Sequence, residues 1–252
     1  MVRLASGVAL AAAVVAAVLL LPVTALRVVA CAVAALAGRE YFEIAGVHLR
    51  AVVLVVALCW VAAGPELPPA YVLLSMALLW VAVDVLFGGD SVHEAAAGLF
   101  ASVYIGLPLG LLVAVHDAHG WPATLLLVAT IVVSDSSQYY TGRLLGRRPL
   151  APAISPNKTV EGALGGLVLG TAFMTLAGGR ALPSAGPAAL AGLGAFVVIM
   201  GICGDLFESR LKRDAAVKDS SSLIPGHGGV LDRVDALLFA VVPFYLFVRN
   251  IP

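Results

Sequence analysis

The residues of this chain that could carry out chemistry concentrate in two polar segments, residues 134–166 and 204–235. In the second segment, Asp205 ends one apolar stretch and Asp232 precedes the next. Apolar helices joined by one connection are usually adjacent and antiparallel, so these two carboxylates should meet at one membrane face. They repel each other unless a cation lies between or beside them. The spacing therefore predicts a Mg²⁺ site formed by Asp205 and Asp232, because open oxygen ligands suit this ion.

The same segment also carries positive charge and a glycine-rich turn. Its basic side chains, which suit phosphate oxygens, are Lys212, Arg213, Lys218 and Arg233. The turn, Pro225-Gly226-His227-Gly228-Gly229, runs into a helix start, where exposed backbone N–H groups could cradle an anion. A metal ion, cations and such amides together are typical of nucleoside triphosphate chemistry. The alternative is a solvated loop whose charges only follow membrane topology.

The first segment offers fewer candidates. Lys158, within Ser155-Pro156-Asn157-Lys158-Thr159, should contact a triphosphate or a lipid phosphate. Asp135 could be an outer metal ligand or bind the nucleoside side of the triphosphate, or it could only hydrogen-bond to neighbouring spans. Glu161 could take part in the site, or it could only cap the positive end of the helix that begins there.

The composition predicts that membrane-spanning helices position these residues. The chain is 61% hydrophobic and 12% charged, with a mean hydropathy of +1.03, whereas a soluble domain carries roughly 25% charged residues. There is too little polar surface to cover a water-soluble globule, so lipid must cover the rest. The net charge of zero argues against an electrostatic nucleic-acid binder. The cysteines fall in apolar stretches and should be small buried side chains.

We predict an all-α polytopic protein of about nine spans, since a span needs about 20 apolar residues or somewhat fewer. No internal repeat or linker divides the chain, so residues 1–252 should form a single domain, with the catalytic half at about residues 100–240. The first two spans should form a retained hairpin rather than a signal peptide, although they could be one kinked element. The spans are 4–21, 23–38, 51–63, 70–87, 97–115, 121–141, 161–179, 187–206 and 234–248.

The positive charges predict the orientation. With the N-terminus in the cytoplasm, twelve of the fifteen Lys and Arg residues fall on the cytoplasmic side, and only Arg27, Arg180 and Arg249 fall opposite. Both polar segments then face the cytoplasm.

The second segment resembles the signature of the phosphatidate cytidylyltransferase (CDP-diacylglycerol synthase) family. The matching pattern is Ser209-Arg210-Leu211-Lys212-Arg213, Lys218-Asp219, Pro225-Gly226-His227-Gly228-Gly229, Asp232-Arg233 and Asp235. Residues 154–162 resemble the family's second landmark. Gln138 and Asn157 depart from the family pattern, which commonly has alanine and lysine there. The resemblance covers residues 100–240 well, whereas the N-terminal spans match only in character.

The resemblance implies a homodimeric, Mg²⁺-dependent membrane enzyme that converts CTP and phosphatidate to CDP-diacylglycerol and pyrophosphate. Asp205 and Asp232 match the metal ligands, and a monovalent cation such as K⁺ could share their site. The positions implied to be catalytic are Lys218, Asp219 and Arg233. Those implied to bind substrate are Lys158, Ser209, Lys212, Arg213, His227, Gly228 and Gly229.

The reaction expected is in-line attack of the lipid phosphate on the α-phosphorus of CTP. The nucleophile is already anionic, so a phosphate-contacting or loop-ordering role suits His227 better than that of a base. Two other functions stay open. A related CTP-dependent transferase or kinase could act on an ether-lipid phosphate or a polyprenol. A transporter is a further alternative, although transporters place polar groups near the bilayer midplane rather than at one face.

Overall fold

The computed structural model describes residues 2–64, 70–87, 92–224, 226 and 228–251, and in this part the chain is almost entirely helical. The chain divides into two compact units, which are described separately below. The first comprises Met1–Ala118 and Asp219–Arg233, and the second comprises His119–Lys218 and Val234–Pro252.

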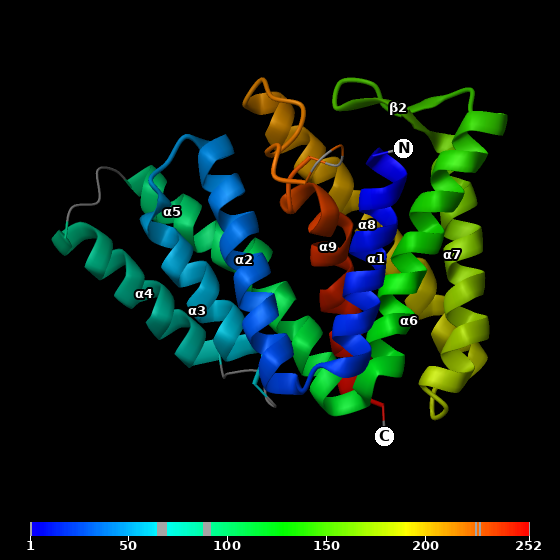
Figure 1. Ribbon diagram of the computed structural model, residues 1–252, viewed down its shortest axis with the longest axis horizontal. Coiled ribbons are helices and arrows are strands. Elements are labelled where there is room, and N and C mark those ends of the chain that lie inside the picture. Colours follow the sequence, from blue (N-terminus) through cyan, green and yellow to red (C-terminus); the bar gives the residue numbers. More distant parts are fainter. Residues whose placement is uncertain (1, 65–69, 88–91, 225, 227, 252) are drawn as a thin grey trace. The chain divides into compact units, whose positions relative to one another are not determined.

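The first unit contains the N-terminal helices (Figure 1). They are α1 (Val2–Leu20), α2 (Val23–Ala45), a 3₁₀ turn (Leu49–Ala51), α3 (Val52–Ala62), α4 (Ala70–Phe87), α5 (Val92–Ala101), a π-helical turn (Ser102–Gly106) and the start of α6 (Leu107–Leu145). Glycines let the π turn and α6 approach the α3 backbone. A Cβ at Gly106 would lie 2.4 Å from the Val55 carbonyl oxygen, and one at Gly110 would lie 2.5 Å from that of Cys59. Small residues at such crossings are typical of helices packed in membranes.

The second unit begins with a break in α6. Gly120 has φ 72° and ψ −175°, a conformation that residues with a side chain rarely adopt, and Pro122 follows it. After α6 come β1 (Pro149–Ala151) and β2 (Ser155–Thr159), which pair antiparallel, then α7 (Val160–Ala181) and α8 (Pro187–Asp214). Most of α9 (Leu231–Arg249) also belongs to this unit.

Glycines on α7 bring α6, α7 and α8 side by side, as Figure 1 shows. A Cβ at Gly162 would lie 2.8 Å from the Gln138 carbonyl oxygen of α6, and one at Gly170 would lie 2.7 Å from Val198 of α8. The start of α7 is capped by Thr159, whose Oγ1 accepts a hydrogen bond from the Gly162 N–H at 3.1 Å. The N-terminal end of α7 is therefore held next to β2, the strand that carries Lys158.

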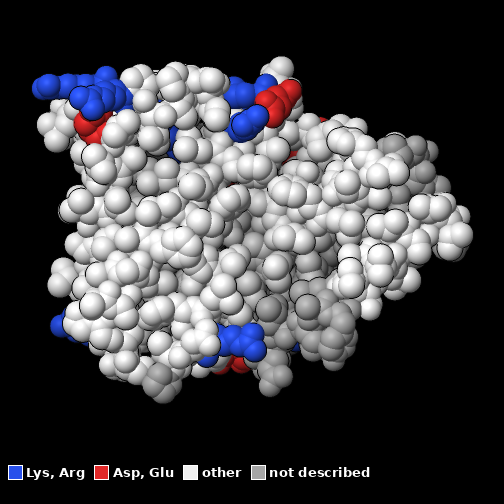
Figure 2. All heavy atoms as spheres, turned by 180° about the vertical axis from the view of Figure 1, so that it is seen from behind, with Lys and Arg blue, Asp and Glu red and all other residues white. Residues whose placement is uncertain are grey.

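The helices follow the nine predicted apolar segments in order, and the prediction of an all-α membrane protein is confirmed. Three helical stretches among the described residues are long and apolar enough to cross a membrane: Val92–Leu145, Val160–Ala181 and Pro187–Asp214. The visible surface agrees, because charged side chains gather at the top and bottom of the view in Figure 2 with a broad uncharged band between them. The number of spans and the cytoplasmic N-terminus stay predictions.

One predicted boundary is wrong in a way that affects the site. The sequence placed the residues after 206 in a loop, whereas α8 continues to Asp214. The apolar run ends near Asp205, but Leu, Arg, Lys and Glu are good helix formers in water. Pairs spaced four residues apart, Glu208 with Lys212 and Arg210 with Asp214, support the extra turns. Ser209, Lys212 and Arg213 therefore project from a helix.

Candidate active site

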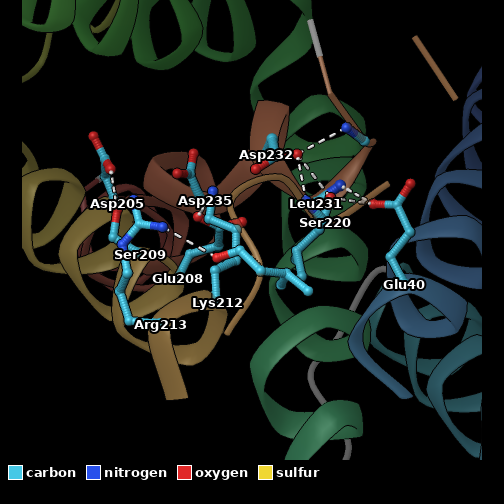
Figure 3. Close-up of polar contacts among 12 residues, drawn as sticks. Glu40, Asp205, Glu208, Ser209, Lys212, Arg213, Ser220, Leu231, Asp232 and Asp235 are labelled. Atoms are coloured by element: carbon cyan, nitrogen blue, oxygen red, sulfur yellow. Dashed lines mark hydrogen bonds and ion pairs between the residues drawn. The ribbon is translucent and has the colours of Figure 1, made fainter. Parts of the chain in front are cut away.

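The first part of the candidate site, in the second unit, is a group of charged side chains around Asp205. Lys158 Nζ, on β2, forms an ion pair with Asp205 Oδ2 on α8. Ser209 Oγ, one turn further along α8, donates a hydrogen bond to Asp205 Oδ1 at 3.4 Å (Figure 3). Asp235 on α9 interacts electrostatically with Asp205, Asp135 and Lys158. Asp235 is therefore within electrostatic range of two other carboxyl groups and of one lysine, and a further cation would balance the negative charge.

An excess of negative charge suits a Mg²⁺ site. The arrangement of the side chains limits how many of them could bind the ion. Among the described residues, no three His, Cys, Asp or Glu side chains are arranged to hold a metal ion. A site in this region would therefore use one or two carboxylates and leave the other positions to water and substrate oxygens, as Mg²⁺ usually does. The carboxylates of this region fit Mg²⁺ bound in this way. Asp235 belongs to the quoted signature but was assigned no role from the sequence.

Asp135 stands on α6 next to the departure at position 138. Gln138 Nε2 donates hydrogen bonds to Asp135 Oδ1 at 3.0 Å and to Ser134 Oγ at 3.2 Å. The glutamine amide therefore orients the Asp135 carboxylate, which alanine could not do. A contact of Asp135 with the metal ion or the nucleotide stays a prediction.

The extended part of α8 holds a buried ion pair. Lys212 Nζ lies 2.5 Å from Glu208 Oε2, and the two side chains are only 11% and 1% exposed (Figure 3). Arg213 instead reaches the hairpin and the end of its own helix, donating to the carbonyl oxygens of Ile154 at 3.4 Å and Val217 at 3.1 Å. Substrate binding by both basic residues stays a prediction, but each also has a structural partner. Glu208 was not singled out from the sequence.

Glu161 has a structural role at the other side of the hairpin. Its Oε2 accepts hydrogen bonds from the backbone N–H groups of Arg147 at 3.0 Å and Arg148 at 3.2 Å, in the turn between α6 and β1. The carboxylate thus ties this turn to the first turn of α7. This supports the structural alternative for Glu161 rather than a part in catalysis.

The second part of the candidate site, in the first unit, is the glycine-rich turn before α9. Asp232 Oδ2 accepts hydrogen bonds from Ser220 N–H at 2.9 Å, Ser220 Oγ at 2.8 Å and Gly229 N–H at 2.7 Å. Gly228 has φ 77°, and a Cβ there would lie 2.5 Å from the same carboxylate oxygen. Glycine is required at position 228 on both counts.

The turn was expected to offer exposed N–H groups to a substrate anion, but those of Gly229, Val230 and Leu231 are hydrogen-bonded within the protein, and substrate contact by Gly229 stays a prediction. The turn does cradle anions, but they are the protein's own carboxylates. Gly229 N–H donates to Asp232, while Val230 and Leu231 N–H donate to Glu40 at 3.0 and 2.8 Å. The sequence had given Glu40, on α2, no role. Substrate contact by Gly228 stays a prediction.

The residues predicted to be catalytic are accessible. Lys218, Asp219 and Arg233 all have exposed side chains, as a group that meets a substrate must have. His227 lies outside the described residues. Asp205 and Asp232 belong to different units, so their joint binding of a metal ion stays a prediction.

Fold and site together define a helical membrane protein with carboxylates and basic side chains at the ends of its helices, suited to phosphate chemistry. The model of the cytidylyltransferase family matches residues 1–251. The phosphatidate cytidylyltransferase of Helicobacter pylori (strain J99 / ATCC 700824) is 37% identical over 194 residues, covering 77% of this chain and 70% of that protein. That of Bacillus subtilis (strain 168) is 40% identical over 149 residues, covering 58% of this chain and 55% of that protein. The chain belongs to the cytidylyltransferase family.

Proposed function

We propose that this protein transfers the cytidylyl group of CTP to phosphatidate, forming CDP-diacylglycerol and pyrophosphate in phospholipid biosynthesis. The observation that carries the proposal is the group of carboxylates around Asp205 and Lys158, found in a chain that matches the family along its whole length. Phosphatidate lies in the membrane and CTP in water. A charged site at the ends of membrane helices is where the two substrates can meet.

In the proposed reaction, a phosphate oxygen of phosphatidate forms a bond to the α-phosphorus of CTP. The bond from that phosphorus to the oxygen bridging to the β-phosphate breaks, and pyrophosphate leaves. Because the attacking oxygen is already anionic, no side chain has to remove a proton. The protein's contribution is therefore positioning and charge neutralisation.

We assign the metal to Asp205 and Asp232, with Asp235 as the carboxylate next to Asp205. Mg²⁺ bound there would neutralise charge on the phosphate oxygens. The exposed Lys218 and Arg233 would bind phosphate oxygens of CTP or of the lipid, and Asp219 would order the connection between α8 and α9. Ser209 and Lys158 would hold the Asp205 carboxylate in place. A K⁺ ion could share the site, as the family resemblance implies.

The proposal is tested by incubating the purified protein with labelled CTP and phosphatidate, with Mg²⁺ or with EDTA. We expect labelled CDP-diacylglycerol and pyrophosphate in equal amounts, and only with Mg²⁺. Parallel reactions with an ether-lipid phosphate and with a polyprenol identify the acceptor. Label transferred to the polyprenol alone, or to no lipid at all, would contradict the proposal.

Lys158→Ala should raise the apparent KM for CTP or phosphatidate by about ten-fold or more. A charge-assisted contact contributes on the order of 1.5–3 kcal/mol, and the variant also leaves Asp205 among carboxylates without its cation. Initial rates over a range of each substrate measure the change. Arg147→Ala, an exposed cation of the same hairpin region, is the matched control. Unchanged kinetics for both substrates would leave Lys158 with a topological role only.

Cysteine labelling in intact cells should place positions 155 and 221 in the cytoplasm and the C-terminus outside, because twelve basic residues then lie inside. We infer that the active site faces the cytoplasmic side of the inner membrane, where CTP is. Labelling of position 221 by an impermeant reagent added from outside would exclude this orientation.

The homodimer implied by the resemblance is tested by measuring the mass of the detergent-solubilised protein.

A further inference from the structure

Glu40 is a buried carboxylate near the end of α2, and the residues that bind it come from the far end of the chain. The residue is only 3% exposed. Its Oε2 accepts hydrogen bonds from Ser220 Oγ and Leu231 N–H, both at 2.8 Å (Figure 3). Its Oε1 accepts them from Ser221 Oγ at 2.6 Å and Val230 N–H at 3.0 Å. A buried charge is tolerated when it is hydrogen-bonded in this way.

Two of these donors are backbone N–H groups at the start of α9. The first N–H groups of a helix have no partner within the helix, and a side-chain oxygen of the preceding residue usually accepts from them. That residue is Val230, which has no such oxygen. Glu40 instead accepts from the N–H groups of Leu231, the first residue of the helix, and of Val230 just before it, 191 and 190 positions away. Its negative charge also suits the positive end of the helix dipole.

Ser220 connects Glu40 to Asp232. The Ser220 Oγ lies 2.8 Å from Glu40 Oε2 and 2.8 Å from Asp232 Oδ2, so its single hydrogen is given to one carboxylate or the other while the oxygen stays in contact with both. Gly229 packs against the same group. A Cβ at Gly229 would lie 2.1 Å from Ser220 Oγ and 2.4 Å from Glu40 Oε2. Movement of Glu40 would therefore change the position of Ser220 and, through it, of the Asp232 carboxylate.

We propose that Glu40 is a positioning residue: it fixes the turn at residues 219–231 and the start of α9, and thereby holds Asp232 in the orientation needed to bind the metal ion. The assignment of the metal to Asp232 rests on the proposed function, whereas the anchoring of the turn does not. The N-terminal helix α2 would then take a direct part in shaping the active site.

Glutamine cannot replace Glu40 in this role. Each carboxylate oxygen accepts from one hydroxyl and one backbone N–H. In Glu40→Gln, the amide NH₂ group must take one of the two oxygen positions, whichever way it is turned. A hydroxyl can reverse its hydrogen bond, but a backbone N–H cannot, so one N–H always meets another donor. The start of α9 would lose at least one of its capping bonds.

The experiment compares Glu40→Gln with two other variants of the full chain in detergent micelles. Ser221→Ala removes one of the four donors and is a milder change should Glu40→Gln fold poorly. Glu43→Gln is the matched control, because Glu43 lies on the same helix and pairs with Arg39 at 2.8 Å with both side chains largely exposed. Hydrogen–deuterium exchange is followed in peptides covering residues 219–233, and turnover is measured against Mg²⁺ concentration.

We expect exchange at residues 229–231 to be at least ten-fold faster in Glu40→Gln, less so in Ser221→Ala, and unchanged in Glu43→Gln. The Mg²⁺ concentration for half-maximal turnover should rise by about ten-fold in Glu40→Gln, which a loss of folded protein alone would not produce. Unchanged exchange would overturn the anchor. Faster exchange with an unchanged Mg²⁺ requirement would overturn the link to Asp232. If wild type produced no CDP-diacylglycerol, the proposed function would fail, while the exchange data would still decide the anchor.

Discussion

Asp205→Asn or Asp232→Asn should lower turnover by at least ~100-fold, because several kcal/mol of transition-state charge stabilisation would be lost. Asparagine keeps the shape of the side chain and removes its charge. Asp205 is the carboxylate around which Lys158, Ser209 and Asp235 gather. Asp232 has one oxygen committed to hydrogen bonds from Ser220 and Gly229, which orient its carboxylate.

The measurement is turnover as a function of Mg²⁺ concentration in both single variants and in the double variant. Excess Mg²⁺ should restore part of the activity of one single variant, because one carboxylate remains, but not that of the double variant. Asp214→Asn, at the exposed end of α8, is the matched control and should keep wild-type activity. Either variant retaining more than a tenth of wild-type turnover, with an unchanged Mg²⁺ requirement, would remove that residue from the metal site.

The sequence predicted the helices well because the helices here are largely set by hydropathy. The predicted segment 70–87 coincides with α4, and α7, α8 and α9 begin within three residues of their predicted starts. The same criterion fails at the C-terminal end of α8, because hydropathy indicates where the membrane-embedded part of a helix ends rather than where the helix itself ends. The hydrogen-bonded turns from Asp205 to Asp214 lie beyond the apolar run.

The candidate site could be predicted in its residue types but not in its pairing. Carboxylates, lysines and a glycine-rich turn before a helix were all evident from the sequence, and the turn does surround an anion. The identity of that anion could not be predicted, because Glu40 lies 190 positions from Val230. One signal was present nonetheless. Val230 leaves α9 without a capping side chain of its own, which predicts that an acceptor from elsewhere in the chain binds the start of this helix.

The buried pair of Glu208 and Lys212 had no such signal, because the same spacing on a helix usually marks an exposed pair. Arg210 and Asp214 form that ordinary kind on the next turn, 3.9 Å apart with side chains 68% and 71% exposed. Glu208 and Lys212 are separated by 2.5 Å and are nearly inaccessible. Removing one member of a buried pair leaves a buried charge without its partner, which costs about 3–5 kcal/mol. An exposed pair contributes only about 0–1 kcal/mol.

Glu208→Gln and Lys212→Met should therefore each lower the free energy of unfolding by about 3–5 kcal/mol, whereas the double variant should recover most of that loss. Arg210→Ala and Asp214→Ala, the matched controls, should each change it by less than about 1 kcal/mol. Unfolding in mixed micelles with increasing denaturing detergent measures all five variants. A double variant as destabilised as the sum of the two single variants would show that the pair is not coupled. The double variant also isolates the predicted substrate contact of Lys212 from its ion pair. If Lys212 binds phosphate, the double variant will be stable yet have a raised KM for CTP or phosphatidate. If Lys212 only neutralises Glu208, both KM values of the double variant will match wild type.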